Sequence, residues 1–346
     1  MSISRRGLIA AGLAVAVVGT LGVVSTMNAG AAETPTSSVA GDGTAVDAAE
    51  VPPALLPWGA VPHPVRKGKF GASSEALAAA GASAATDDTS SSRRVTAFGP
   101  KGQSRRGGVL QTSETSVPPL PPSRAATANT EVDYLYTVGQ QSAVTDGVAG
   151  LFTVAKPTVA PADWHSLAEA AVQSADGLQV VEVGWTVDRS TFGDEETHLF
   201  VYHWVDGQPT CYGCDFLQYS KTVAPGAILA EGTTKQFGIQ HFNSAWWIAY
   251  DSEWIGSFPD KLWAGRFVQS GMVQVFGEVA ASSAQPCTQM GNGKTPESTA
   301  AARIGSVTYV NGPTVALRVN ATTDVYATAQ LSDRTFRYGG PGASVC

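Results

Sequence analysis

A strand pattern is found in Leu178-Gln179-Val180-Val181-Glu182-Val183-Gly184-Trp185-Thr186-Val187. Successive side chains of a β-strand point to opposite faces, so residues two apart share a face. The odd positions are apolar and are predicted to face the core: Val181, Val183, Trp185 and Val187. Glu182 then projects from the opposite face, where Gly184 leaves space beside it.

Residues 272–279 have the same design. Val273, Val275 and Val279 share one face, and Glu278 lies on the other. Further strands are predicted at residues 199–205, 226–230, 235–241, 245–250, 306–310, 314–320 and 324–330. Many short strands separated by turn residues indicate an antiparallel β-sandwich or barrel.

One helix is predicted at residues 164–174. Pro161 precedes it, and Asp163 is a candidate N-cap.

The 346 residues divide unevenly. Residues 32–129 are rich in Ala, Ser, Thr, Pro and Gly, whereas residues 130–346 hold seven of the eight tryptophans and all four cysteines. We therefore expect one folded domain at 130–346 behind a weakly structured leader. The net charge is +3 over residues 1–130 and −10 over the remainder. An acidic domain argues against a nucleic-acid partner, and we expect a monomer.

The N-terminus resembles an export signal, with Arg5 and Arg6 before an uncharged apolar stretch at residues 7–27. Ala29-Gly30-Ala31 supplies small residues for cleavage, which predicts a signal peptide at 1–31 and a secreted protein with no membrane contact after cleavage. Both the Sec and the twin-arginine routes fit this signal. An uncleaved membrane anchor is the alternative, because about 20 apolar residues can span a bilayer.

The leader contains one apolar segment, residues 51–58, and dibasic pairs at 93–94 and 105–106. Its composition alone favours a spacer. The alternative is a pro-segment whose apolar piece covers the active site until the chain is cut at an exposed loop.

The four cysteines suggest two disulfides in an exported protein. We favour Cys211 with Cys214 and Cys287 with Cys346 among the three possible connectivities. A redox or zinc role for the Cys-Tyr-Gly-Cys motif is the alternative, but zinc usually requires a second ligand pair. No metal or other cofactor is expected.

The catalytic candidates are Glu182 and Glu278. The Gly-x-Ser-x-Gly motif is absent, and the five scattered histidines are interpreted as structural. Two carboxylates in one groove can hydrolyse a bond by general acid–base catalysis, one ionised and one protonated. The same pair would serve a peptidase or a glycosidase, and a solvent-facing glutamate is more often only solubilising.

Several segments, in order along the chain, resemble the neprosin family, which is known from plants and actinobacteria. Residues 181–187 are similar to its Glu-Ala-Gly-Trp-Gln-Val strand, and residues 276–279 to its Trp-Gly-Gly-Glu-Val strand. The other matching segments are residues 193–202, 210–214, 246–263, 288–293 and 338–346.

The resemblance implies a β-sandwich with a long groove and a glutamic peptidase whose catalytic pair is Glu182 and Glu278. It also implies a proenzyme, activity at acidic pH, a peptide substrate and cleavage after proline as in the plant prototype. It favours the pro-segment interpretation of residues 32–129. As supporting residues we predict Gln289 as a donor to the oxyanion, and Trp246 and Tyr250 as groove-lining residues, with core packing as their alternative. A cell-wall carbohydrate-binding or glycan-hydrolysing sandwich is the competing function.

Overall fold

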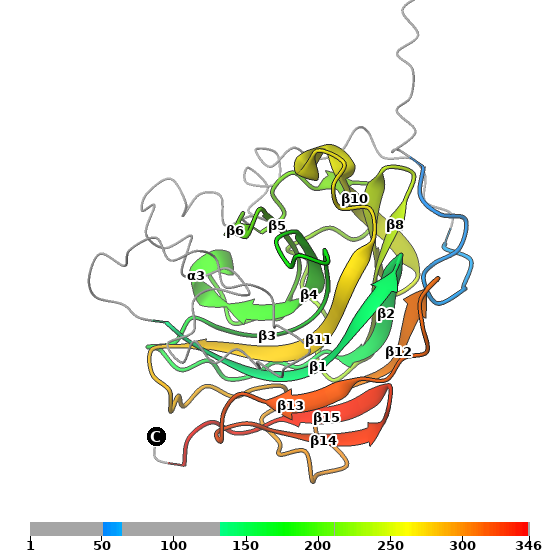
Figure 1. The fold of residues 1–346 in the computed structure, drawn as a ribbon. Helices are drawn as coiled ribbons and strands as arrows, with labels where there is room; N and C mark the ends of the chain where they lie inside the picture. Colours follow the sequence, from blue (N-terminus) through cyan, green and yellow to red (C-terminus); the bar gives the residue numbers. More distant parts are fainter. Residues whose placement is uncertain (1–50, 64–131, 211, 345–346) are drawn as a thin grey trace, which may run out of the picture. The chain divides into compact units, whose positions relative to one another are not determined.

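The computed structural model describes residues 51–63, 132–210 and 212–344. The described chain is dominated by strands, which form two antiparallel sheets (Figure 1). Their inner faces pack together through one hydrophobic core, so the predicted antiparallel β-sandwich is confirmed. Apolar residues recur at every second position along strands such as β4 and β11, which gives the inner faces a continuous apolar surface.

The first sheet has seven strands in the order β13-β1-β11-β3-β4-β5-β6. Its strands are β1 (Asp133–Thr145), β3 (His165–Gln173), β4 (Val180–Asp188), β5 (His198–Val205), β6 (Gln208–Pro209), β11 (Ser270–Ala281) and β13 (Arg318–Ala321). A one-turn helix, α3 (Arg189–Phe192), follows β4, and the Asp188 carboxylate caps it by accepting from the backbone N–H groups of Ser190 and Thr191.

The second sheet has eight strands in the order β14-β15-β12-β2-β8-β9-β10-β7. Its strands are β2 (Gly147–Thr153), β7 (Leu217–Gln218), β8 (Thr234–Phe242), β9 (Ala245–Tyr250), β10 (Glu253–Pro259), β12 (Arg303–Val310), β14 (Ala327–Ser332) and β15 (Thr335–Gly339). The 3₁₀-helix η2 (Asp260–Trp263) follows β10.

The predicted faces of β4 and β11 are confirmed. Val181, Val183 and Trp185 lie in the core between the sheets, together with Val273 and Val275. The even-numbered residues of both strands therefore occupy the outer face of the seven-stranded sheet.

The helix predicted at residues 164–174 is wrong, because this stretch is strand β3. Ala168, Ala170 and Val172 alternate into the core, and the strand pairs with β4 on one side and β11 on the other. Alanine and glutamate favour a helix in isolation, but the two neighbouring strands override this preference. The strand predicted at residues 226–230 is reduced to a single bridge between His198 and Ile228.

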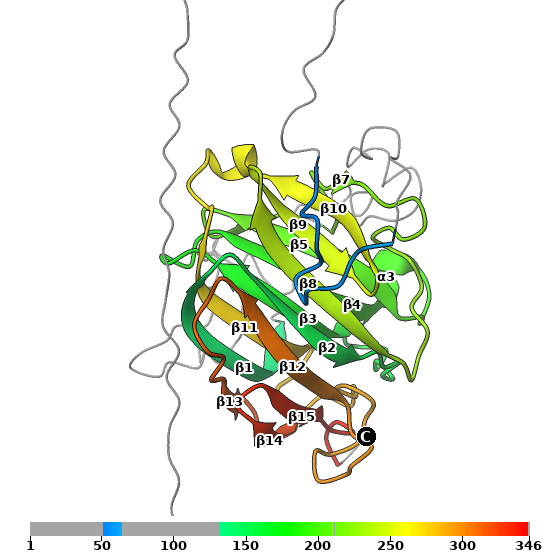
Figure 2. The same cartoon turned by 90° about the vertical axis from the view of Figure 1, so that its right-hand side faces the viewer.

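Residues 51–63, here called the N-terminal strap, pack on the eight-stranded sheet (Figure 2, in blue). They belong to the same compact unit as the sandwich. Leu56 is buried against Ala245, Trp247, Ala249 and Trp254 of that sheet. The prediction that this apolar piece covers the predicted catalytic glutamates is therefore wrong, since those glutamates project from the other sheet.

The predicted signal peptide and the dibasic pairs lie outside the described residues. Among the described helices, none has the length and apolar character needed to cross a membrane. Each predicted disulfide includes a residue outside the described ranges, Cys211 or Cys346, so the pairing stays a prediction.

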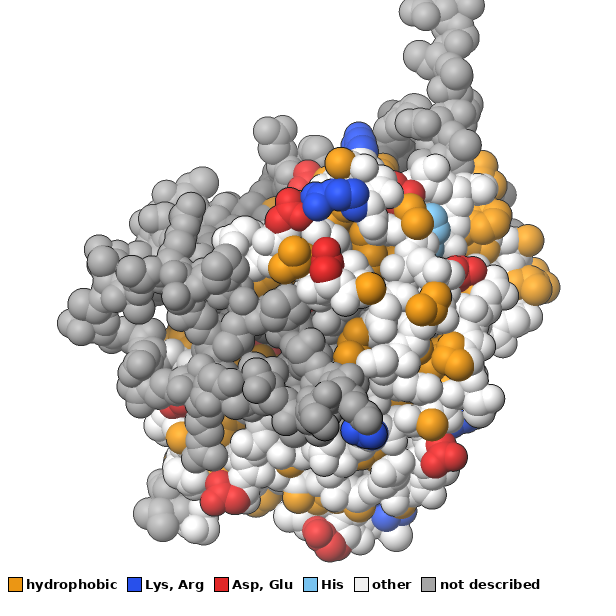
Figure 3. Space-filling view, in the orientation of Figure 1, with side chains coloured by type: hydrophobic (Ala, Val, Ile, Leu, Met, Phe, Trp, Pro, Cys, Tyr) orange, Lys and Arg blue, Asp and Glu red, His pale blue; other side chains and the backbone are white. Residues whose placement is uncertain are grey.

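On the described part of the face in Figure 3, Lys and Arg side chains are scattered among Asp and Glu.

Candidate active site

Three glutamates lie on the outer face of the seven-stranded sheet, on adjacent strands. Glu182 is on β4, Glu169 on β3 and Glu278 on β11, and all three are completely buried. The strand order β11-β3-β4 places Glu169 on the strand between the two predicted catalytic residues. The structure therefore adds a third carboxylate to the predicted pair.

The register arranges the three glutamates in a diagonal row. Glu169 is opposite Gly184 on β4 and Phe276 on β11. Glu182 precedes Gly184 by two residues, whereas Glu278 follows Phe276 by two residues. Diagonal neighbours on adjacent strands have backbones about 7–8 Å apart, within reach of long side chains. Each outer glutamate is thus a diagonal neighbour of Glu169.

Gly184 is required for this packing. A Cβ atom at this position would lie 2.2 Å from the backbone oxygen of Ala168 and 2.7 Å from Cβ of Glu169. A glycine here lets the two strands approach closely beside Glu169. The space that the sequence predicted beside Glu182 therefore serves Glu169 as well.

Glu182 accepts a hydrogen bond from an indole. Nε1 of Trp204 donates to Oε1 of Glu182 over 3.1 Å, and both side chains are buried. The backbone oxygen of Trp204 in turn accepts from Nε1 of Trp263, 2.8 Å away. This second bond ties the C-terminal end of β5 to η2, and so holds the indole beside the carboxylate.

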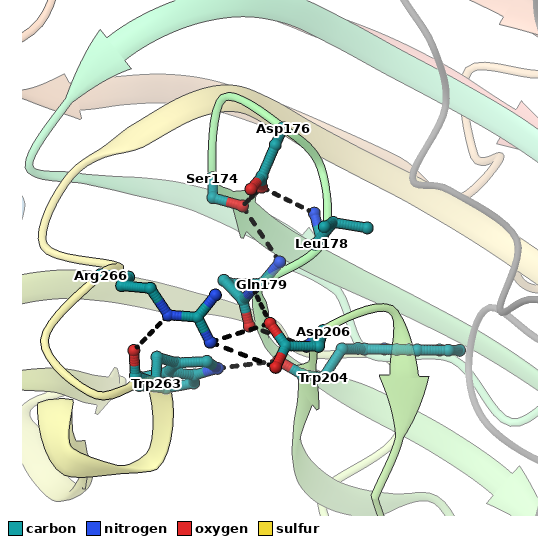
Figure 4. A network of polar contacts seen from close by, with 8 residues as sticks. All are labelled: Ser174, Asp176, Leu178, Gln179, Trp204, Asp206, Trp263 and Arg266. Atoms are coloured by element: carbon teal, nitrogen blue, oxygen red, sulfur yellow. Dashed lines mark hydrogen bonds and ion pairs between the residues drawn. The ribbon is translucent and has the colours of Figure 1, made fainter.

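A polar network continues from this point to the β3–β4 turn (Figure 4). The Gln179 side chain exchanges hydrogen bonds with Asp206, at 2.8 Å to its carboxylate and 2.9 Å from its backbone N–H. Arg266 binds the same carboxylate and also donates to the backbone oxygen of Trp263. The Gln179 and Arg266 contacts lower the pKa of Asp206. The network fixes the ends of β4 and β5 around the Glu182–Trp204 pair.

Glu278 has a different set of neighbours. Nε2 of His165 lies 2.8 Å from Oε1 of Glu278, and both residues are fully buried. Tyr136 is directly opposite Glu278 on β1. Burial raises the pKa of Tyr136 well above its usual value, and the negative charge of Glu278 raises it further. Tyr136 therefore remains a protonated phenol, able to donate a hydrogen bond at this site.

Two further hydroxyl groups on this face are buried. Among the described residues, neither Thr186 Oγ1 nor Tyr134 Oη has a hydrogen-bond partner. Thr186 lies on the same face as Glu182. It belongs to a row of paired residues that runs across four adjacent strands, Thr186–Leu167–Glu278–Tyr136. Buried hydroxyl groups are normally hydrogen-bonded, so these two are exceptions on the face that carries the glutamates.

The predicted supporting residues lie elsewhere. Trp246 and Tyr250 of β9 are buried in the core between the sheets, and Nε1 of Trp246 donates to the backbone oxygen of Phe267. Their prediction as groove-lining residues is wrong, because these even positions of β9 face inward. Gln289 accepts from the backbone N–H of Thr158 through Oε1. Its role as an oxyanion donor stays a prediction.

Sequence reasoning missed Glu169, His165, Tyr136 and Trp204. The first two lie on β3, and the helix prediction removed the alternation that would have placed them on the same face as Glu182 and Glu278. The apolar sequence Ala168, Ala170, Val172 was the available signal.

Residues 162–341, just over half of the chain, match the family model named Neprosin. The chain belongs to the neprosin family. The resemblance carried by the strand motifs is thereby confirmed, and with it the class of a glutamic peptidase. No curated protein matches the chain.

Solved structures give distant likenesses to this chain. A scytalido-glutamic peptidase with a transition state analog inhibitor is 10% identical with a TM-score of 0.41, over 62% of this chain and 100% of that one. SCP-B, an eqolisin peptidase in complex with the tripeptide Ala-Ile-His, is 11% identical with a TM-score of 0.35, over 61% and 100%. A chicken liver agglutinin, CG-16, is 11% identical with a TM-score of 0.26, over 43% and 96%. Likenesses at this level say nothing about activity.

Proposed function

We propose that this member of the neprosin family is a secreted endopeptidase, acting at acidic pH, in which Glu278 activates water and Glu182 protonates the substrate. The observation that carries the proposal is the row of buried glutamates on β4, β3 and β11, whose two outer members have different hydrogen-bond partners. Two carboxyl groups in different environments can hold different protonation states at one pH.

His165 supports the assignment of Glu278 as the base. With its proton on Nε2, 2.8 Å from Oε1, the imidazole donates a hydrogen bond that stabilises the ionised form of Glu278. Glu278 then takes a proton from water as the water oxygen attacks the carbonyl carbon of the peptide bond. Tyr136, opposite Glu278, is a donor for the negative charge that develops on the carbonyl oxygen.

Glu182 supplies the acid. Trp204 occupies Oε1 of Glu182, so the acidic proton of its protonated form is carried on Oε2. Glu182 gives this proton to the carbonyl oxygen as the tetrahedral intermediate forms. When the C–N bond breaks, the leaving amine takes the proton held by Glu278, and the carbonyl oxygen returns its proton to Glu182 as the C=O bond re-forms. Both carboxyl groups are thereby restored.

The proposal includes synthesis as a zymogen. All three glutamates have no exposed surface in the full chain, so a peptide cannot reach them without a change in structure. Removal of part of the leader is the change that the family resemblance suggests. The same resemblance is the basis for proposing cleavage after proline.

The test is to replace each predicted catalytic residue by its amide. We expect Glu182→Gln and Glu278→Gln, after processing of the leader, to lose at least about 100-fold in kcat/KM on a proline-containing peptide at about pH 4, because each loses an ionisable group needed in the reaction. Glu231→Gln is the matched control, since Glu231 is an exposed glutamate of the same domain.

Near wild-type cleavage by either variant would refute the assignment. Retention of the wild-type protein on cell-wall polysaccharide, with no proteolysis at any pH, would favour the carbohydrate-directed alternative.

A further inference from the structure

The N-terminal strap is an uncharged segment of 13 residues that makes specific contacts with the sandwich. Nε1 of Trp254 donates to the backbone oxygen of Pro53 over 3.0 Å. The backbone N–H of His63 donates to the oxygen of Ser252 over 2.8 Å. Leu56 between these two points is only 3% exposed, whereas its neighbour Leu55 is 49% exposed. The strap is therefore bound at both ends and anchored by a side chain in the middle.

The strap also has a turn of its own. The backbone N–H of Leu56 donates to the oxygen of Ala60, and the N–H of Gly59 donates to the oxygen of Leu56. Pro53, Pro57 and Pro62 restrict the unbound segment further. A segment that is already restricted loses less conformational entropy on binding, which favours a stable complex.

The sheet surface beneath the strap is shaped for it. Trp247 and Trp254 pack edge-to-face with ring centroids 6.2 Å apart and form the floor beside Leu56. At Gly238 of β8, a Cβ atom would lie 2.9 Å from Cγ of Pro57 and 3.1 Å from Cζ3 of Trp58. The absence of a side chain at this position therefore makes room for the strap.

The strap and the three glutamates occupy opposite outer faces of the sandwich. Trp247 points outward from β9, while its neighbours Trp246 and Ile248 point into the core. Glu182 likewise points away from the same core, on the other sheet. A bound strap therefore does not obstruct access to the glutamates.

We propose that the strap stays bound to the eight-stranded sheet after the chain is cut between residues 64 and 131, so that the processed protein consists of two non-covalently associated pieces. The leader is then a pro-segment with a permanent anchor on the back of the domain. The proposal is independent of catalysis, because any protease that cuts this region would produce the same two pieces.

The test uses the full chain with the recognition sequence of a site-specific protease inserted between Arg93 and Arg94. After cleavage, gel filtration in native buffer is expected to recover the N-terminal piece with the domain, and the two should separate only in denaturant. Leu56→Ala should weaken the association at least about 30-fold, as the loss of a buried leucine side chain predicts. Leu55→Ala is the matched control and should change it less than about threefold.

Two further measurements keep the test decisive if Leu56→Ala does not fold. A synthetic peptide of residues 51–63 should displace the N-terminal piece from the cut wild-type protein, and a peptide of the same composition in scrambled order should not. Gly238→Ala, which changes the sheet and leaves the strap sequence intact, should release the piece more readily. Separation of the cut wild-type pieces in native buffer, or equal effects of Leu55→Ala and Leu56→Ala, would overturn the proposal.

Discussion

Replacing His203 by phenylalanine is expected to make the protein more resistant to unfolding by acid. His203 lies on the core side of β5 and is 1% exposed. Its ring packs against Phe258 and Trp263, with centroid distances of 4.8 and 5.8 Å. The carboxylate of Asp215 is 3.9 Å from Nε2, too far for a hydrogen bond. The Thr210 hydroxyl lies 3.1 Å from Nδ1. Burial of the ring lowers the pKa of His203 to about 3.

The sign of the effect follows from proton binding. The unfolded chain binds a proton at His203 below about pH 6.5, whereas the folded chain binds it only below about pH 3. Between these values the unfolded state holds one more proton, so stability falls as the pH falls. At about 1.4 kcal/mol per pH unit, the residue removes about 3 kcal/mol of stability between pH 7 and pH 4. Native proteins have about 5–15 kcal/mol in total, so this loss is large.

The assay is urea unfolding at pH 7 and pH 4, followed by tryptophan fluorescence. Phenylalanine retains a ring of similar size, and the Thr210 hydroxyl retains its hydrogen bond to the backbone oxygen of residue 203. Between pH 7 and pH 4, we expect the free energy of unfolding to fall by about 3 kcal/mol less in His203→Phe than in the wild type. His63→Gln is the control, since His63 is exposed. An equal loss for His203→Phe and the wild type would refute the reasoning.

Two other substitutions test the site. Trp204→Phe removes the indole N–H that binds Glu182, a bond to a charged group worth about 1.5–3 kcal/mol. We expect the alkaline limb of the pH–rate profile, which the general acid Glu182 sets, to move up by about one to two pH units, because the ionised form of Glu182 loses a donor. Trp246→Phe removes an equivalent buried indole N–H in the core and should leave that profile unchanged. Gly184→Ala places a Cβ atom 2.2 Å from the backbone oxygen of Ala168 and should lower the free energy of unfolding by about 3 kcal/mol. A change below about 0.5 kcal/mol in thermal or urea unfolding would show that the strands can separate at this point.

The loss of stability from His203 has a bearing on the proposed acidic activity. The chemistry requires one protonated and one ionised carboxyl group, whereas the core contains a histidine that resists protonation. The sandwich stays folded at the acidic pH of the proposed reaction only if its free energy of unfolding at neutral pH exceeds the stability lost at His203 on acidification. His203→Phe measures that cost directly.

Alternation along single strands was enough to predict part of the site. The odd residues of β4 and of β11 are apolar, and a strand has only two faces, so Glu182 and Glu278 could be assigned to the non-core face without a structure. The same reasoning failed for β9, where both faces are apolar: Trp246 and Trp247 are both buried, one in the core and one beneath the strap. When both faces of a strand are apolar, the sequence pattern cannot show which face packs in the core between the sheets and which is covered by another segment.

The sequence by itself determined that the domain is an antiparallel sandwich or barrel and that two glutamates lie off its core, because these features depend on the alternation of neighbouring side chains. The resemblance to the neprosin family narrowed the architecture to the sandwich. Only the tertiary structure decided that β3 lies between β4 and β11, which brings Glu169 and His165 to the same face, and that the strap binds the opposite sheet. Strand order and docking depend on contacts between residues far apart in the chain, and these contacts override the local preferences that a sequence displays.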